Sequence, residues 1–287
     1  MGYSGDRYDS TIPDASMIDL HCHMLPAIDD GARDLETALQ MAALAVDDGI
    51  TLTACTPHIY PGVFDNTVEG IQEAVQRFRA ELESAGIPLQ LTYGADIQVQ
   101  PGLVKGLEDG TLPTLGESRY FLFEPPHHTP LPRLGDLVHG ALLAGYVPII
   151  THPERLAYIE ADYDKFVEFA RQGAWIQLTG GSLLGRFGPR VQKISNRFLQ
   201  DGITHLLASD AHNLGKRTPQ LSEARDAAAA IVGAHEAARL VLGRPSAVIA
   251  DANPVDFPLP PGLGSTAFNE SGAQVKPGWI QRIFGGA

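Results

Sequence analysis

Cysteine, basic residues and long apolar runs are all scarce in this sequence, and each shortage excludes a class of protein. Two cysteines, Cys22 and Cys55, do not make the disulfide framework of a secreted domain, so a reducing, cytoplasmic setting is expected. The 21 lysines and arginines are outnumbered by 34 aspartates and glutamates, and the formal charge of −13 argues against nucleic-acid binding. No apolar run approaches the length of a membrane span, so membrane insertion is not expected.

The two ends differ in composition from the body of the chain. Residues 1–16 are polar and without periodicity, which predicts a disordered leader or a cloning remnant. Residues 251–287 begin rich in proline and glycine, which predicts an extended tail. Residues 17–250 form one predicted domain, because no second domain and no internal repeat is visible.

The body alternates short apolar runs with helical stretches. Residues 34–49 open with a possible Asp cap and close at Gly49, and residues 67–86 run in the same way to Gly86. The alternation predicts an α/β fold, namely a TIM-like barrel that is one strand short, a distorted (β/α)7 barrel. A doubly wound open sheet is the alternative. The predicted parallel strands are 17–22, 50–56, 89–95, 119–124, 147–151, 174–179 and 204–209.

Potential metal ligands mark the ends of six of these seven strands. In the first strand, His21 and His23 point to the same side and Cys22 to the other. The carboxyl ends of barrel strands form a single rim, so these side chains are expected to converge there. The set contains five imidazoles and four carboxylates: His21, His23, Asp30, His58, Asp96, Glu124, His152, Asp210 and His212.

Nitrogen and oxygen ligands without thiolate suit manganese, iron or zinc. Nine ligands exceed what one ion uses, which predicts two or three divalent ions. Against four carboxylates, two ions leave the site near neutral and three leave it at about +2, a charge that attracts a phosphoryl dianion. Arg155 and Arg217, which closely follow His152 and His212, are predicted to clamp phosphate oxygens. Arg186, in a glycine-rich loop, is a weaker candidate.

The ordered motifs resemble a known family. "IDLHCH", "DDG", "TPH", "GAD", "FLFEPP", "HPER" and "SDAH", in this order, resemble the polymerase-and-histidinol-phosphatase (PHP) superfamily. "HPERL", "SDAHN" and "GSLLGRFG" make the chain most similar to the CpsB/YwqE type of bacterial manganese-dependent protein-tyrosine phosphatases, which are tied to capsule and exopolysaccharide synthesis. The resemblance covers residues 17–250 and implies a PHP-type, seven-stranded distorted barrel with three metal ions.

The resemblance also implies how the ligands are shared among the ions. Asp29 is the alternative to Asp30, and the family usually has a glutamate where this chain has the shorter Asp96. One ion would take His21, His23, Asp96 and Asp210, a second Asp96, Glu124 and His152, and a third Asp30, His58 and His212.

The reaction implied by the resemblance is metal-assisted hydrolysis of a phosphotyrosine ester without a covalent enzyme intermediate. Its catalytic residues would be Arg155, Arg217, Asp210 and His212. A cysteine mechanism is excluded, because it needs an arginine six residues after the cysteine and Ile28 and Pro61 stand there. The implied partner is a phosphotyrosine protein, such as a bacterial tyrosine kinase of a polysaccharide export system, and an oligomer is compatible with the sequence.

Other functions stay open at this point. A PHP phosphatase of small molecules, such as histidinol phosphate, would use the same rim. A nuclease or proofreading module is disfavoured by the acidic composition. An amidohydrolase also starts from His-x-His on a barrel but commonly uses a carboxylated lysine, and no lysine ends a predicted strand. A non-catalytic, metal-dependent sensor or scaffold of a polysaccharide machine is the alternative outside enzymes.

Overall fold

The structure is a computed structural model that describes residues 16–264. The predicted leader, apart from Ser16, and residues 265–287 of the predicted tail lie outside the described residues. The strands are β1 (Met17–Cys22), β2 (Ile50–Cys55), β3 (His58–Ile59), β4 (Gln90–Tyr93), β5 (Asp96–Gln98), β6 (Tyr120–Glu124), β7 (Val147–Thr151), β8 (Trp175–Thr179) and β9 (Leu206–Ala208).

The helices lie mostly between consecutive strands. The α-helices are α1 (Leu35–Asp47), α2 (Val68–Ala85), α3 (Leu103–Glu108), α4 (Leu134–Leu143), α5 (Ile159–Gln172), α6 (Gly180–Leu183), α7 (Pro189–Gln200), α8 (Ser222–Val232), α9 (Ala234–Ala238) and α10 (Arg244–Ile249). The short helical turns are η1 (Leu115–Glu117), η2 (Pro153–Arg155), η3 (Arg239–Gly243) and η4 (Pro254–Asp256). The predicted caps of α1 and α2 are confirmed: Asp34 accepts a hydrogen bond from the Thr37 amide, and Gly86 ends α2 in the left-handed conformation.

All strand pairs are parallel, and they follow the order of the chain around a distorted barrel. One sheet has the order β1-β2-β4 and the other β3-β5-β6-β7-β8-β9. Backbone hydrogen bonds from Gly94 to Cys55 and from Asp96 to Pro57 carry the pairing across the break between the sheets. A parallel bridge between Cys22 and Ala211 joins the last strand to the first. The predicted seven-stranded distorted barrel is confirmed.

Two predicted strands are interrupted near their ends. The predicted strand 50–56 stops at Cys55, and His58 begins the separate strand β3. The predicted strand 89–95 stops at Tyr93, so Asp96 begins β5 instead of following a strand. The interruptions arise where Pro57 lacks an amide donor and where Gly94 packs against the Leu115 side chain too closely for a β-carbon.

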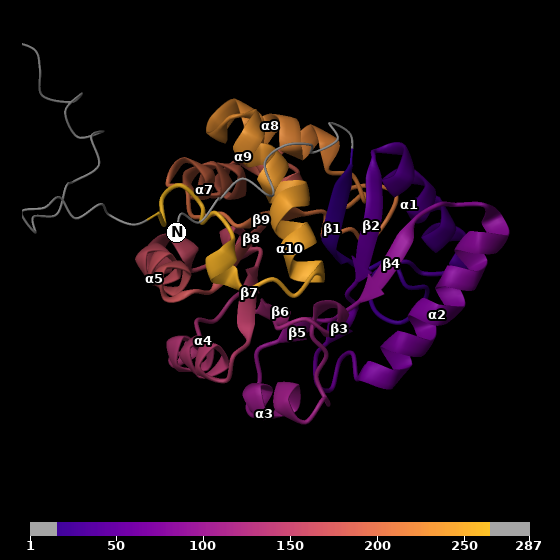
Figure 1. The fold of residues 1–287 in the computed structure, drawn as a ribbon, viewed down its shortest axis with the longest axis horizontal. Coiled ribbons are helices and arrows are strands. Elements are labelled where there is room, and N and C mark those ends of the chain that lie inside the picture. Colours follow the sequence, from indigo (N-terminus) through magenta and orange to yellow (C-terminus); the bar gives the residue numbers. More distant parts are fainter. Residues whose placement is uncertain (1–15, 265–287) are drawn as a thin grey trace, which may run out of the picture.

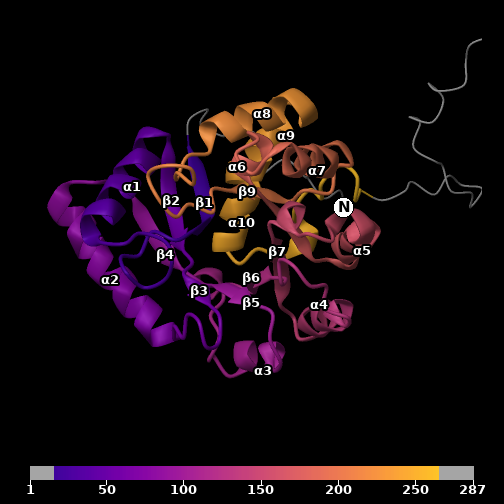
Figure 2. The same cartoon turned by 180° about the vertical axis from the view of Figure 1, so that it is seen from behind.

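The core has two layers, as a barrel of strands inside helices requires. The outer layer packs helix residues such as Met41 and Phe78 against outward strand residues. The inner layer lies near the amino ends of the strands and includes Ile18, Tyr120 and Trp175. Val248 of α10 belongs to the inner layer, and Figures 1 and 2 both show α10 across the middle of the ring of strands. Helix α10 therefore closes the amino end of the barrel, leaving the carboxyl end for the site.

An irregularity in β1 sets the direction of its histidines. Between Asp19 and Cys22, β1 takes one residue more than the paired β2, which is the geometry of a β-bulge. The extra residue lets Leu20 join the inner apolar layer while His21 faces the carboxyl-end crevice. Cys22 points outward into the helix-facing layer, as predicted from the alternation. Within the residues described, no helix has the length and apolarity that crossing a membrane requires.

Candidate metal centre

The nine predicted ligands meet at the carboxyl end of the barrel, in overlapping groups whose ligand atoms lie within 4.8 Å of one another, with Asp210 joined to them through His21 and His23. His58 and Asp96 begin the short strands β3 and β5, and the others come from the end of a strand or from the loop that follows it. They are buried, apart from Asp30 and the partly exposed His58. Residues as far apart in the sequence as positions 21 and 212 therefore line one crevice, because the barrel brings the carboxyl ends of its parallel strands together.

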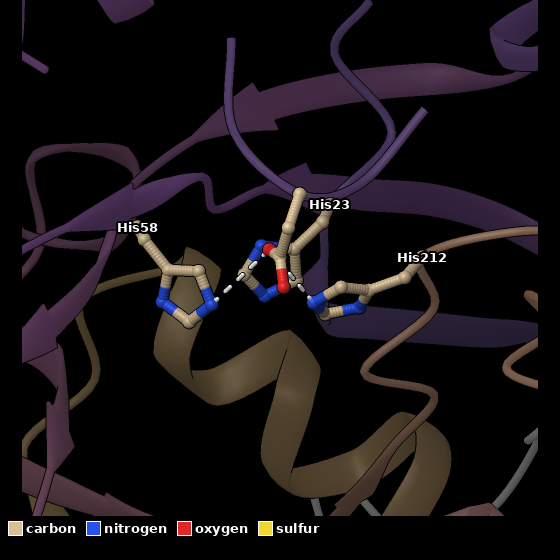
Figure 3. A group of neighbouring side chains, drawn as sticks. His23, His58 and His212 are labelled. Carbon is tan, nitrogen blue, oxygen red and sulfur yellow. Dashed lines mark ion pairs between the residues drawn. The ribbon is translucent and has the colours of Figure 1, made fainter. Parts of the chain in front are cut away.

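The first group consists of His23, Asp30, His58 and His212. Figure 3 shows the three histidine rings converging from separate segments. The Oδ1 atom of Asp30 lies 3.5 Å from His58 Nε2 and 3.3 Å from His212 Nε2. The His23 and His212 ring centres are 3.9 Å apart. Three imidazoles and one carboxylate at this spacing match the donor set of a divalent transition-metal ion.

Asp96 lies at the middle of the site. Its Oδ2 atom is 3.3 Å from His21 Nε2, and 3.7 Å from both His58 Nδ1 and His152 Nε2. It takes part in one group with His21 and His23 and in another with His58 and Glu124. A carboxylate shared between two groups is suited to bridging two ions, and the shorter aspartate reaches both.

Sequence reasoning missed His127. Its Nε2 atom lies 3.3 Å from Glu124 Oε1, and its ring centre lies 5.0 Å from that of His152. These three residues form a further group of potential ligands. The available signal was the spacing Glu-x-x-His, which runs from the last residue of β6 into the following loop and brings the two side chains together.

Two side chains orient the histidines from behind. His23 donates its Nδ1 proton to Asp29 Oδ2 at 2.7 Å, and His21 donates to Gln177 Oε1 at 2.8 Å. In both rings the Nε2 atom is then the one turned to the crevice, and these two atoms are 3.1 Å apart. Carboxylates and amides in this position hold metal-binding imidazoles in the correct tautomer. Gln177 is a second residue that the sequence analysis did not select.

The two predicted phosphate-clamping arginines both contact Asp210. Arg217 Nη2 lies 2.6 Å from Asp210 Oδ1, and Arg155 pairs with the other oxygen. The Arg155 guanidinium is stacked 4.8 Å above the Phe187 ring, which limits its movement. Arg186, the weaker candidate, instead pairs with Thr218 and Glu223 away from this carboxylate.

The backbone is strained at two of the site residues. His152 has a φ angle of 35° and Asp210 one of 50°, a region that residues other than glycine rarely adopt. His152 directly follows β7 and Asp210 lies two residues after the end of β9, so both strained residues stand at the carboxyl-end rim of the barrel. Backbone strain of this kind clusters at functional sites.

A buried carboxylate outside the ligand set fixes β1 against the end of β9. Asp19 accepts hydrogen bonds from the backbone amide and hydroxyl of Ser209 and from the His21 amide. Burial raises the pKa of Asp19 to about 6. Because it holds the residues next to His21 and Asp210, Asp19 positions two ligands without facing the crevice.

The protonation of the cluster reflects its crowding. Burial opposes a charged imidazole at His21, but Asp96 and Asp210 outweigh it and raise the pKa of His21 to about 9. Burial lowers the pKa of His23 to about 3 and raises that of Glu124. Metal ligands bind in their deprotonated form, so ion binding here must displace protons.

The residues present fit a metal cluster. Several polar atoms of the group are buried without a hydrogen-bond partner, which is costly unless another species binds them. They are His58 Nδ1, Asp96 Oδ2, His152 Nδ1 and His212 Nε2, and each of these residues belongs to at least one of the candidate groups. Cys22 and Cys55 are buried on the outer side of the barrel, where burial raises the pKa of both thiols, so neither reaches this site as a nucleophile.

Comparison with known proteins agrees with this geometry. The family described as "Capsular polysaccharide synthesis, CpsB/CapC" matches residues 17–250. The tyrosine-protein phosphatase YwqE of Bacillus subtilis is 36% identical over 209 residues, which cover 72% of this chain and 82% of that protein. The tyrosine-protein phosphatase CpsB of Streptococcus pneumoniae is 29% identical over 240 residues, which cover 82% of this chain and 99% of that protein.

A solved structure is similar over the same region. It is described as belonging to crystal structures of YwqE from B. subtilis and CpsB from S. pneumoniae, "unique metal-dependent tyrosine phosphatases". The TM-score is 0.79 at 33% identity, with 83% of this chain and 96% of the other covered. The matched family region contains every rim residue described above. The chain therefore belongs to the CpsB/CapC family.

Proposed function

We propose that this chain is a metal-dependent protein-tyrosine phosphatase, a phosphoric monoester hydrolase that releases phosphate from tyrosine side chains. The observation that carries the proposal is the convergence of unpartnered histidine and carboxylate atoms with two arginines at one end of the barrel. Membership of a family whose curated relatives are named tyrosine-protein phosphatases gives the reaction class.

The proposed cofactors are two or three divalent ions, manganese first, with iron or zinc as the alternatives. The donor set of imidazoles and carboxylates supports this choice. We assign one ion to His21, His23, Asp96 and Asp210, a second to Asp96, Glu124 and His152 with His127 in reach, and a third to Asp30, His58 and His212. When bound, such ions would act as Lewis acids and would lower the pKa of a bound water, so that hydroxide is available at neutral pH.

The protein's own contribution is to bind and align the phosphate. Arg155 and Arg217 carry donors that match phosphate oxygens, and Phe187 stacks on the first of them. Asp210 orients both guanidinium groups toward the crevice. His212 donates from Nδ1 to the Asp210 carbonyl and keeps Nε2 toward the same space. Holding the phosphate in line for attack by water contributes much of the rate enhancement in reactions of this type.

The leaving group needs little assistance. A tyrosine phenolate is a moderately good leaving group, so the protein has to supply only modest protonation as the ester bond breaks. No covalent intermediate forms in this proposal, because both cysteines are buried away from the crevice and keep their protons.

The proposed substrate is a phosphotyrosine protein, and a bacterial tyrosine kinase of a polysaccharide export system is the specific candidate. Support comes from the family, which is described by its role in capsular polysaccharide synthesis. A cytoplasmic location is proposed on the ground that both cysteines are free thiols in the core.

The test combines metal analysis with phosphatase assays on p-nitrophenyl phosphate and a phosphotyrosine peptide. We expect two or three divalent ions per chain, hydrolysis of both substrates, and complete loss of activity in excess chelator. His152→Ala should lower both the metal content and the activity, the latter by more than about 100-fold. The matched control is His139→Ala, which removes an exposed histidine of α4 and should change neither. Full activity in excess chelator would overturn the proposal.

A further inference from the structure

We propose that the cavity beside the metal centre is the subsite for the aromatic ring of the substrate. Its floor is formed by metal-site residues and its outer wall by residues 60–64, which we call the aromatic turn. The inference rests on the proposed function and names a specificity determinant within it.

The cavity is continuous with the site. Asp30, His58 and Glu124 line it directly, and its volume is about 440 Å³. Volumes of about 300–1,000 Å³ are typical of pockets that hold small molecules or side chains. A phosphate bound among the metal ligands would therefore direct its ester substituent into this cavity, between the loop after β3 and the loop after β6.

The aromatic turn is held in place by its own backbone. Tyr60 and Phe64 exchange two backbone hydrogen bonds, of 3.0 and 2.8 Å, as an antiparallel bridge. Gly62 has a φ angle of 78°, and its amide donates to the Asp65 carboxylate. Asn66 donates to the carbonyl of His58 at 2.8 Å. The wall is thus fixed relative to a metal-site residue before substrate arrives, which reduces the entropic cost of binding.

The turn presents apolar and aromatic surface to the cavity. The Phe64 ring is stacked on the imidazole of His58, with ring centres 5.6 Å apart and an interplanar angle of 15°. Eight large apolar side chains among the described residues are exposed, and Tyr60 and Val63 are two of them. Exposed apolar side chains grouped at a pocket rim are typical of a binding surface. An aryl ring would gain edge or stacking contacts here.

The charges of the lining favour an uncharged ring over a second anionic group. The residues that line the cavity include the carboxylates Asp30 and Glu124 but no lysine or arginine. Because Asp30 and Glu124 are assigned to bound ions, their charge is already compensated, and the second phosphate of a sugar diphosphate or nucleotide would find no lysine or arginine in the lining to pair with. Gln98, His128 and Thr129 supply hydrogen-bonding groups on the other side, which suit the backbone of a peptide that carries the ring.

The test measures the preference for aryl over alkyl phosphates. Wild type, the double variant Tyr60→Ser/Val63→Ser and Phe64→Leu are assayed on a phosphotyrosine peptide and on the same peptide with phosphoserine. We expect the ratio of kcat/KM values, tyrosine over serine, to fall about threefold to tenfold in each variant, mainly through KM for the phosphotyrosine peptide. Inhibition by inorganic phosphate, which needs only the metal centre and the arginines, should not change.

The matched control is Leu143→Ser, which removes an even more exposed apolar side chain from α4, outside the cavity lining. Metal content is measured for every variant, since Phe64 contacts His58; if Phe64→Leu loses metal, the double variant decides. If wild type dephosphorylates the phosphotyrosine peptide but the ratio is unchanged in the double variant, the subsite is overturned while the proposed function stands. Absence of any wild-type activity on phosphotyrosine would instead overturn the proposed function.

Discussion

At the scale of single residues, neighbours in the sequence take different roles at the site. Asp30 lies among His58 and His212, whereas Asp29 lies behind His23 and accepts its Nδ1 proton. Asp29 also accepts from the amides of Gly31 and His58. Geometry thus favours Asp30 as the ligand and Asp29 as the residue that orients a ligand.

Asparagine substitutions should separate these two roles. Asp30→Asn removes a charged ligand, so the protein should lose one ion per chain on dialysis against a weak chelator. Asp29→Asn keeps all ligands and should retain the ion with an affinity about 10–100-fold lower. Metal analysis over a chelator series measures both, and the opposite order of effects would reverse the assignment.

A second residue-scale effect lies far from the metal centre, at His205. This buried imidazole accepts a hydrogen bond from the Ile176 amide and stacks on Trp175, and burial holds its pKa well below the usual value of 6.5. Below pH 6.5 the unfolded chain takes up a proton that the folded chain does not. The free energy of unfolding should therefore fall as pH falls, by up to about 1.4 kcal/mol per pH unit from this group.

His205→Asn keeps an acceptor for Ile176 but cannot titrate. Urea unfolding of metal-free protein between pH 5 and 7.5 should show a shallower decline for the variant than for wild type. Parallel curves would mean that His205 titrates alike in the folded and unfolded states.

At the scale of elements, α10 combines an apolar face with a buried charge. Arg244, at its first position, is 1% exposed and pairs with Glu236 at 2.7 Å while donating to the carbonyl of His205. It also contacts the Pro258 carbonyl, and Gly262 pairs with Gly202 by a backbone hydrogen bond. Part of the predicted tail, residues 251–264, thus packs against the closed end of the barrel.

Breaking this pair should be costly because the buried Glu236 carboxylate then keeps only its longer, 3.5 Å ion pair with the partly exposed Arg239. Arg244→Ala is expected to lower the free energy of unfolding by about 3–5 kcal/mol. The double variant Arg244→Met/Glu236→Leu removes both charges and should recover most of that loss. Denaturant unfolding of the three proteins checks the prediction, which fails if the double variant is less stable than the single one.

At the scale of the whole molecule, the barrel brings buried carboxylates and imidazoles close together at its carboxyl end. When no cation is bound, these groups repel one another and lose contact with water. Bound ions should stabilise the folded chain. When the free ion concentration is a hundred times the Kd of a site, binding at that site adds about 2.7 kcal/mol to the free energy of unfolding. Chelation is therefore expected to lower the midpoint of thermal unfolding by roughly 5–10 °C, with recovery on adding manganese. Calorimetry with and without chelator measures the shift. An identical midpoint would show that the site gains nothing from metal.

The sequence alone determined the fold class and the approximate place of the ligands. Strands, helices and caps are local patterns, so they could be assigned without knowing the neighbours. Once the strands are parallel, their carboxyl ends share one rim, and residues at those ends must lie near each other. This is why nine candidate ligands, scattered from His21 to His212, could be selected before their contacts were known.

Tertiary structure alone decided which side chains of the site contact one another. The β1 bulge, the turn that brings His127 to Glu124, and the pairing of Arg155 and Arg217 with Asp210 depend on strand register and loop paths across the closed barrel. So does the separation of Asp29 from Asp30. Distances between distant loops follow from packing of the whole chain, and no local pattern encodes them.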